Sequence, residues 1–283
     1  MLIKTYKINF VASLFPLYDK EEIESFFYII LEELHQKKRI DIALAPNLII
    51  SENDLKKWDA IVEQLKLEIP IQYCLGKTNF FGLDFEVNNA TLIPRPETEE
   101  LVSLVLSENR LVNNSTPRIL DIGTGSGCIA IALAKNLPTA SVTAIDVSSD
   151  ALAVAKKNAE RNNVQVFFIQ RDILRTTDLG PQFDCIVSNP PYVRHLEKEE
   201  MKKNVLDYEP HLALFVADDD ALVFYKKIGE LALKSLVQGG KLYFEINQYL
   251  GKETVTLLEQ MGYKKVQLLK DCYGNDRMIR ASI

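Results

Sequence analysis

Hydrophobic residues near the start of the chain recur at steps of three and four, the spacing of one face of an α-helix. Asp19 can cap a first helix and Ser51 a second, which Pro70 ends. The apolar stripes of the two helices are Ile23, Phe26, Phe27, Ile30, Leu31 and Leu34, then Leu55, Trp58, Ile61, Val62, Leu65 and Ile69. Residues 1–72 are therefore predicted to form a small helical bundle, with its tryptophan in the core, that is suited to docking a partner.

The hydrophobic pattern then changes to alternation. In residues 80–87 apolar and polar side chains alternate around a glycine, and two asparagines follow, which is typical of a β-hairpin. We therefore expect residues 73–92 to be a hairpin linker. Residues 93–102, Ile-Pro-Arg-Pro-Glu-Thr-Glu-Glu-Leu-Val, suit the start of a helix, because acids are favoured in the first turn by the macrodipole. A helix start does not explain Arg95 between its two prolines.

Short apolar strands and helical segments alternate from residue 118 onward. Strands are predicted at 118–122, 141–146, 164–169, 183–187, 241–246, 264–269 and 278–283, with helices at about 128–136, 148–162, 221–236 and 255–261. Strands separated by helices form a parallel, doubly wound sheet, and the last two strands pair as an antiparallel hairpin. Residues 93–283 are therefore predicted to be an α/β domain with a Rossmann-like, seven-stranded, mostly parallel sheet, as in class I methyltransferases.

A glycine loop, Gly123-Thr124-Gly125-Ser126-Gly127, directly follows the strand at 118–122, and Asp146 ends the next strand. Strand, glycine turn, helix, strand and acid make up a nucleotide site in which the acid binds ribose hydroxyls. The dinucleotide pattern would need a glycine at position 128, where this chain has Cys128. We therefore favour a nucleoside cofactor without phosphates, S-adenosyl-L-methionine. A structural glycine turn without a ligand is the alternative.

A proline-rich ledge, Asn189-Pro190-Pro191-Tyr192, ends the apolar strand at 183–187. Proline cannot donate a ladder hydrogen bond, so the strand must stop here, and two prolines in succession stiffen the backbone. The carboxyl ends of parallel strands are where open α/β sheets bind ligands. The ledge presents one carboxamide and proline carbonyls, which suits a planar group bearing an NH2. An ordinary proline-rich loop is the alternative.

Composition narrows the candidate functions. Lys and Arg number 33 against 39 Asp and Glu, and the net charge of −6 with a pI near 5.3 disfavours a grip on nucleic acid phosphates. No apolar stretch reaches the roughly 18 residues of a membrane span. The cysteines and histidines show no disulfide or metal-ligand spacing: Cys74, Cys128, Cys185, Cys272, His35, His195 and His211. We expect a reduced, cytoplasmic protein without metal or membrane attachment.

Over about residues 70–283 the chain resembles the HemK/PrmC family, the release-factor N5-glutamine methyltransferases. The matching pieces are Pro70 with Gln72-Tyr73 and Gly76, residues 93–99, the glycine loop, Asp146, the ledge, Tyr208-Glu209-Pro210, and Gly274 with Asp276-Arg277. The predicted bundle is consistent with the family's release-factor docking domain, although its sequence matches only loosely. Residues 218–221, Asp-Asp-Asp-Ala, depart from the glycine-containing turn of the family pattern.

The resemblance implies specific roles for these residues. The five glycine-loop residues would line the methionine end of S-adenosyl-L-methionine, Asp146 would hold its ribose, and Asp172 with Ile173 would border its adenine. The substrate would be the glutamine of the Gly-Gly-Gln tripeptide of peptide chain release factors. Asn189 Oδ1 and the Pro190 carbonyl would accept the two amide N–H bonds, and Tyr192 would pack on the amide plane.

Two alternative functions remain open from the sequence. A DNA or RNA amino-methyltransferase would hold the exocyclic NH2 of a flipped base on the same ledge, although the acidic pI and the lack of a basic recognition segment disfavour it. A catalytically silent protein that only binds a partner is disfavoured by the intact loop and ledge. We expect a monomeric enzyme that produces S-adenosyl-L-homocysteine and acts in translation termination.

Overall fold

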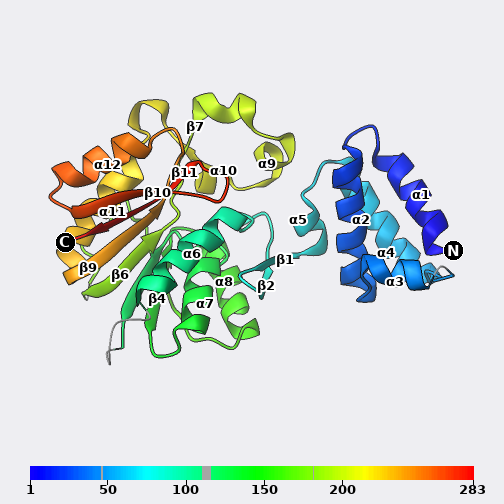
Figure 1. The fold of residues 1–283 in the computed structure, drawn as a ribbon, viewed down its shortest axis with the longest axis horizontal. Coiled ribbons are helices and arrows are strands. Elements are labelled where there is room, and N and C mark those ends of the chain that lie inside the picture. Colours follow the sequence, from blue (N-terminus) through cyan, green and yellow to red (C-terminus); the bar gives the residue numbers. More distant parts are fainter. Residues whose placement is uncertain (46, 110–115, 181) are drawn as a thin grey trace. The chain divides into compact units, whose positions relative to one another are not determined.

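The computed structural model describes residues 1–45, 47–109, 116–180 and 182–283. The chain divides into two compact units, which are described separately (Figure 1). The first unit comprises residues 1–76 with 202–208, and the second comprises residues 77–201 with 209–283. The short segment 202–208 in the first unit is a feature that the sequence analysis did not predict.

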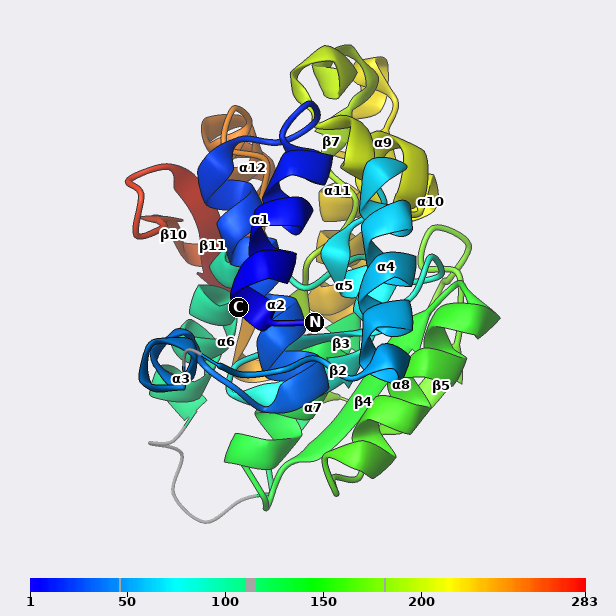
Figure 2. The same cartoon turned by 90° about the vertical axis from the view of Figure 1, so that its right-hand side faces the viewer.

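The first unit is a bundle of helices (Figure 2). Aromatic side chains are buried in its core. Its helices are α1 (Ile3–Leu14), α2 (Lys20–His35), α3 (Arg39–Leu44), α4 (Glu52–Lys66), α5 (Ile71–Leu75) and α9 (Lys203–Tyr208). The predicted caps are confirmed, because Asp19 accepts from Glu22 N and Ser51 from Asp54 N. Trp58 is fully buried, as expected. Helix α1 was missed, because apolar residues such as Ile8 and Phe15 also occupy its exposed side and blur the periodicity.

The second unit is built on a seven-stranded sheet in the order β10-β11-β9-β6-β3-β4-β5. Its strands are β3 (Arg118–Ile122), β4 (Ser141–Asp146), β5 (Phe167–Gln170), β6 (Phe183–Ser188), β9 (Leu236–Glu245), β10 (Lys264–Lys270) and β11 (Asp276–Ser282). Among the described strands of this sheet, only the pairs β10–β11 and β11–β9 are antiparallel. The predicted mostly parallel sheet with a terminal antiparallel hairpin is therefore confirmed.

Helices cover both faces of this sheet (Figure 1). They are α6 (Pro96–Asn109), α7 (Cys128–Asn136) and α8 (Ser149–Arg161) on one face, and α11 (Val223–Ser235) and α12 (Gly251–Gln260) on the other. Successive strand residues alternate between the faces, so Ile119 packs with α7 whereas Leu120 packs with α11. The central strands are buried on both sides, as their continuous apolar runs predict.

Strand β9 begins at Leu236, five residues before the predicted start, so Gly239 and Gly240 lie inside the strand instead of in a turn before it. Its pairing with β6 shifts register between Phe183 and Cys185. Gly239 has φ +78°, and a side chain at Gly240 would come within 2.8 Å of the Val237 carbonyl oxygen. The two glycines therefore belong to an irregularity within the strand. Strand β5 starts at Phe167, later than the predicted Val164.

The hairpin formed by β1 (Lys77–Phe80) and β2 (Leu83–Glu86) packs on α8 through a buried asparagine. The Asn158 side chain accepts from Glu86 N at 2.6 Å and donates to Glu86 O at 3.0 Å and to Ser126 O at 2.9 Å. One side chain therefore fixes both the hairpin and the glycine loop.

Short elements fill residues 193–220: β7 (Val193–Arg194), 3-10 turns at His195–Glu200 and Asp218–Asp220, α10 (His211–Leu214) and β8 (Phe215–Val216). The acidic stretch that departs from the family pattern forms the second of these turns, and Asp218 accepts from Leu196 N. Among the described residues, no helix is long and apolar enough to cross a membrane.

Candidate active site

A cavity of about 340 Å³ lies at the carboxyl ends of β3, β4, β5 and β6. The predicted site residues that line it are Gly123, Gly125, Asp146, Asp172, Ile173, Asn189, Pro190 and Pro191. The sequence analysis missed a second set of lining residues: Ala90, Thr91, Leu92, Pro210, Leu212, Ala213, Phe224 and Ile228. The missed set comes from loops, α10 and α11, where no motif marks a ligand contact. The predicted residues Thr124, Ser126, Gly127 and Tyr192 are not part of the lining.

The glycine loop turns sharply at its three glycines, which have φ values of +76°, +54° and +83°. A methyl group on Gly127 would come within 2.9 Å of Ile131 Cδ1 and 3.1 Å of Ala155 Cβ, so this glycine permits close packing of α7 on α8. Gly125 has no neighbour within 4 Å on that side and faces open space. Gly125 therefore leaves room beside the loop, whereas Gly127 has a packing role.

Asp146 accepts two backbone hydrogen bonds, one of them from the glycine loop. Its Oδ2 accepts from Gly125 N at 2.8 Å, and its Oδ1 accepts from Ser148 N at 2.9 Å. Burial raises the pKa of this carboxyl, although the hydrogen bonds from Ser148 and Gly125 act in the opposite direction. The predicted ribose ligand thus also fixes the shape of the glycine loop, which the sequence alone did not reveal.

Asp121 supports the glycine loop from outside the cavity lining, and it was not singled out from the sequence. It is fully buried under the loop, where Thr124 Oγ1 donates to its Oδ2 at 2.6 Å. Burial raises its pKa to about 7, and the nearby negative charge of Asp146 adds to that rise. Its Oδ1 has no hydrogen-bond partner in the described part of the chain. Asp121 does not line the cavity, so it acts on a ligand there only through its charge.

Asp172 and Ile173 line the cavity just beyond the carboxyl end of β5. Asp172 Oδ1 accepts from Leu174 N at 2.9 Å, and its Oδ2 lies 3.3 Å from Arg175 Nε. Ile173 is buried and packs in the same core as β3 and α11. The carboxylate therefore shapes its own turn, and Ile173 supplies an apolar surface.

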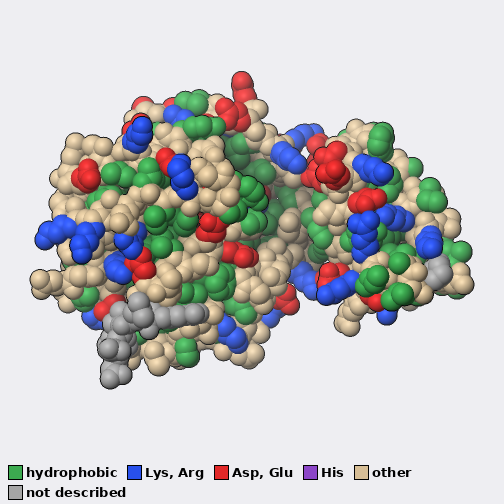
Figure 3. Space-filling view, in the orientation of Figure 1, with side chains coloured by type: hydrophobic (Ala, Val, Ile, Leu, Met, Phe, Trp, Pro, Cys, Tyr) green, Lys and Arg blue, Asp and Glu red, His purple; other side chains and the backbone are tan. Residues whose placement is uncertain are grey.

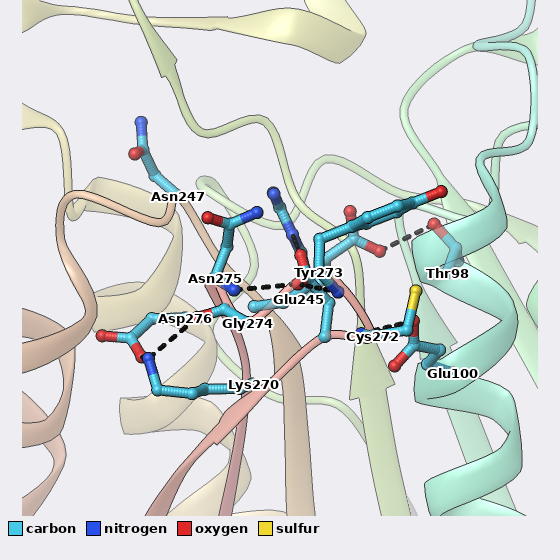
Figure 4. A network of polar contacts seen from close by, with 12 residues as sticks. Thr98, Glu100, Glu245, Asn247, Lys270, Cys272, Tyr273, Gly274, Asn275 and Asp276 are labelled. Carbon is cyan, nitrogen blue, oxygen red and sulfur yellow. Dashed lines mark hydrogen bonds and ion pairs between the residues drawn. The ribbon is translucent and has the colours of Figure 1, made fainter.

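The ledge is held by a chain of side-chain hydrogen bonds. Asn189 Nδ2 donates to Thr98 Oγ1 at 3.2 Å, and Thr98 Oγ1 donates to Glu245 Oε2 at 2.7 Å, as the dashed line in Figure 4 marks. Tyr192 donates its hydroxyl to Glu245 Oε1 at 3.0 Å. Asn189 Oδ1 accepts no hydrogen bond from any described residue. The carboxamide is thus anchored by its nitrogen, and its oxygen is left available.

The chain after the ledge is fixed by a second buried asparagine. Asn247 Nδ2 donates to the Tyr192 carbonyl oxygen at 3.0 Å and to both carboxylate oxygens of Glu197. Arg194 also pairs with Glu197. Tyr192 is therefore bound through its hydroxyl to Glu245, at the carboxyl end of β9, and through its carbonyl oxygen to Asn247, just beyond that end.

Residues 93–100 connect the site to distant parts of the second unit. Arg95 pairs with the buried Glu209, which also accepts from Ile93 N at 3.1 Å. Glu99 accepts from Phe81 N at 2.8 Å, and Glu100 accepts from Cys272 N at 3.1 Å (Figure 4). The arginine between two prolines is thereby explained. The acids at 99 and 100 bind backbone N–H groups elsewhere, in addition to favouring the helix start.

The Gly274 to Arg277 motif shapes the turn between β10 and β11. Gly274 has φ +86°, Lys270 Nζ contacts Asp276 Oδ1 at 2.9 Å, and Arg277 Nε contacts Asp271 Oδ2 at 3.2 Å. Figure 4 shows this turn beside Glu245 and Thr98. The motif therefore supports the region next to the ledge and is not part of the cavity lining.

Comparison with known proteins gives two family matches. Residues 102–208 match the Methyltransferase small domain, and residues 17–76 match the PrmC N-terminal domain. Release factor glutamine methyltransferase of Flavobacterium psychrophilum is 61% identical over 283 residues, covering 100% of this chain and 99% of that protein. The protein of the same name from Bacteroides thetaiotaomicron is 45% identical, covering 95% of this chain and 96% of that protein.

The fold is also similar to solved structures. A methyltransferase from Pyrococcus furiosus aligns with a TM-score of 0.51 at 22% identity, covering 72% of this chain and 90% of that one. At this identity the likeness concerns the fold alone, and it agrees with the class I methyltransferase architecture predicted from the sequence.

Proposed function

Because this chain belongs to the HemK/PrmC family of release factor glutamine methyltransferases, we propose that its cavity binds S-adenosyl-L-methionine next to Asn189, which receives the substrate amide. The chain is an enzyme that methylates the side-chain amide nitrogen of a release-factor glutamine. Following the family resemblance, we assign that glutamine to the Gly-Gly-Gln tripeptide.

The residues around the cavity fit such a cofactor. A volume of about 340 Å³ falls within the range of small-molecule sites. The negative charge of Asp121, buried under the loop, favours a positively charged amino group near the loop, and Asp146 has the acceptor oxygens that ribose hydroxyls need. Gly125 leaves open space beside the loop, and Ile173 adds an apolar wall. When bound, S-adenosyl-L-methionine supplies an electrophilic methyl group on a positively charged sulfur.

The chain's contribution to methyl transfer is to orient the substrate amide. An amide nitrogen is a poor nucleophile because its lone pair is delocalised into the carbonyl group. Asn189 Oδ1 and the Pro190 carbonyl oxygen would accept its two N–H bonds and direct the lone pair toward the methyl group. Methylation makes the remaining N–H protons more acidic, and one proton leaves to water or to a ledge oxygen.

The observation that carries this proposal is the polarity of the Asn189 side chain. Its NH2 group is already used by Thr98, and its oxygen is available as an acceptor. An acceptor is what a substrate NH2 group requires. Tyr192 donates its hydroxyl to Glu245, which fixes the ring at the end of the ledge. Packing of this ring on the amide plane remains part of the proposal.

A protein substrate agrees with the charge of the molecule. The net charge is −6, and basic and acidic side chains are interspersed on the face shown in Figure 3. Non-specific binding to nucleic acid depends on neutralising several phosphates with lysine and arginine. We therefore propose release factors as the partners, without direct nucleic acid contact, and a monomeric enzyme acting in the cytoplasm where translation terminates.

The proposal is tested by incubating the protein with methyl-labelled S-adenosyl-L-methionine and a purified release factor. We expect label on the wild-type factor and none on a factor whose Gly-Gly-Gln glutamine is replaced by alanine. Unmethylated DNA and RNA serve as parallel substrates. Label in the nucleic acids alone would establish the alternative amino-methyltransferase, and label on the alanine-substituted factor would exclude that glutamine as the acceptor.

A further inference from the structure

We propose that Thr98, oriented by Glu245, is a positioning residue that determines which end of the Asn189 carboxamide faces the substrate. This inference rests on the proposed function, because it concerns how the ledge receives the glutamine amide. It adds residues from α6 and β9 to the predicted site, which comprised the loop, the ledge, Asp146, Asp172 and Ile173. Thr98 and Glu245 do not line the cavity, so they would act through Asn189 and Tyr192.

The donors and acceptors of Thr98, Glu245 and Asn189 determine the direction of the carboxamide. A threonine hydroxyl has one proton to donate. Thr98 donates it to Glu245 Oε2 at 2.7 Å, so its oxygen can only accept toward Asn189. Asn189 must therefore present its NH2 group to Thr98, at 3.2 Å, and turn its oxygen the other way. The carboxamide has a defined direction because Thr98 has no second proton.

Burial makes this direction strict. Thr98 is 2% exposed and Glu245 is 1% exposed, so water has little access to replace a mismatched partner. Tyr192 donates to the other oxygen of Glu245, at 3.0 Å. Burial raises the pKa of Glu245, whereas the Thr98 and Tyr192 hydroxyls and the positive charge of Arg277 favour the ionised form. A carboxylate that accepts from two hydroxyls keeps the Thr98 proton pointed away from Asn189.

The reverse orientation would prevent binding of the substrate amide. If the Asn189 oxygen faced Thr98, its NH2 group would face the glutamine NH2 group, and two donors would meet without an acceptor. Without the hydroxyl, the carboxamide loses the one side-chain hydrogen bond that it makes among the described residues. The expected consequence is slower methyl transfer with little change in cofactor binding.

The test compares two substitutions of Thr98 that differ in one hydroxyl. Thr98→Val removes the hydroxyl at nearly constant volume, and Thr98→Ser keeps it. We expect single-turnover methyl transfer to release factor to fall about 100-fold in Thr98→Val and to stay within about threefold of wild type in Thr98→Ser. The cofactor dissociation constant should stay within about threefold in both. Thr98→Ala carries the same expectation as Thr98→Val if the valine variant does not fold.

Thr254 offers a matched control. It is a fully buried threonine of α12 whose hydroxyl donates to the Leu250 carbonyl oxygen, and it lies outside the cavity lining. We expect Thr254→Val to transfer methyl groups within about twofold of the wild-type rate. A 100-fold loss in this variant as well would assign the Thr98→Val effect to the fold and overturn the inference.

A double variant separates positioning from a structural role. If Thr98 acts through Asn189, then adding Thr98→Val to Asn189→Ala should cause no further loss of rate, because the oriented group is already gone. An additive loss would overturn the inference. So would a wild-type rate in Thr98→Val.

An NMR measurement decides the orientation without any substrate. The side-chain NH2 cross-peaks of Asn189 are assigned by their disappearance in Asn189→Ala, and their proton exchange is then compared between wild type and Thr98→Val. Slow NH2 exchange in wild type that becomes fast in Thr98→Val supports the hydrogen bond between Asn189 and Thr98. Equal exchange rates in the two proteins would overturn the inference. If the wild-type enzyme labels no release factor, the proposed function fails, but this measurement still tests the positioning by Thr98.

Discussion

The glycine loop and the ledge line the same cavity, but their supporting contacts span different distances in the sequence. Thr124 binds Asp121 three residues away, and Gly125 binds Asp146 twenty-one residues away. The ledge instead depends on Thr98, which lies 91 residues from Asn189. Glu245 lies 147 residues from Thr98. The loop is thus supported by contacts that are closer in the sequence than those that support the ledge.

This difference suggests that the two sides of the cavity, the loop wall and the ledge wall, have different functions. The loop wall presents carboxylates and open glycine backbone, which suit recognition of a cofactor with a charged amino group and a ribose. The ledge wall presents oriented acceptors, which suit a reacting NH2 group. If the division holds, substitutions in the loop wall should change cofactor affinity, and substitutions in the ledge wall should change the rate of methyl transfer.

The largest effect is expected from Asn189→Ala. It removes one of the two proposed acceptors of the reacting amide and leaves both prolines in place. Single-turnover methyl transfer should fall about 100- to 1,000-fold, the scale of other preorganised polar groups. Cofactor affinity, measured separately by calorimetry, should change far less. Near-normal transfer would reduce Asn189 to a residue that ends a strand before proline.

Asp146→Asn should weaken cofactor binding by about 1.5 to 3 kcal/mol, because charge-assisted hydrogen bonds to ribose hydroxyls are lost. In the structure the same carboxylate also holds Gly125 N and Ser148 N, so the loop loses support at the same time. Calorimetric titration measures the change. An unchanged dissociation constant would mean that Asp146 serves the fold only.

Removal of residues 1–76 of the first unit asks whether the two walls are sufficient. A chain beginning at Lys77 keeps every residue that lines the cavity. We expect cofactor affinity within about threefold of wild type but at least about tenfold weaker methylation of intact release factor, because docking area remote from the chemistry is lost. A short Gly-Gly-Gln peptide should be less affected. Equal losses on peptide and protein would show that the first unit only stabilises the second.

A pH dependence is expected from Asp121, whose pKa is raised by burial from 3.8 to about 7. Below pH 7 its carboxyl becomes neutral and loses its attraction for a cationic amino group. Cofactor affinity should therefore fall by up to about tenfold per pH unit below 7. Asp121→Asn should bind the cofactor weakly at every pH. Calorimetry over about pH 5.5 to about 8 compares the cofactor affinity of wild type with that of the variant. Equal pH dependence in both proteins would contradict the assignment.

The same carboxyl affects stability with a definite sign. The folded chain holds the Asp121 proton more tightly than the unfolded chain does, so its cost to folding is complete above pH 7 and absent below the unfolded pKa of 3.8. Asp121→Asn removes this cost. Thermal unfolding without cofactor should therefore show the variant melting above wild type at pH 8, with the difference shrinking toward pH 4.

The same difference in sequence separation explains what could be predicted from the sequence. The glycine loop and the ledge were predicted from short continuous motifs, Asp146 from its place at the end of a strand, and the sheet from alternating strand and helix segments. The roles of Thr98 and Glu245 depend on which strand ends meet in space, which a one-dimensional pattern does not give. The start of β9 was wrong because a glycine pair usually marks a turn, whereas here the register irregularity with β6 accommodates it.

The 93–100 segment also makes contacts with distant residues that could not be predicted from the sequence. Its helix start was predicted from the prolines and acids. The partner of Arg95 is Glu209, 114 residues later, and both belong to motifs that were identified separately. Their side chains could be connected only once the fold was known. Asp121 was overlooked because an acid inside a predicted strand looks like an ordinary strand residue until its burial is seen.

The most direct test of the central claim measures two quantities in the same two variants. The cofactor dissociation constant and the single-turnover rate at saturating cofactor are determined for Asn189→Ala and for Asp146→Asn. The two-wall account predicts opposite outcomes: near-normal affinity with slow transfer in Asn189→Ala, and weak affinity with near-normal transfer at saturation in Asp146→Asn. If both variants lose affinity and rate in the same proportion, the two walls do not act separately and the account is contradicted.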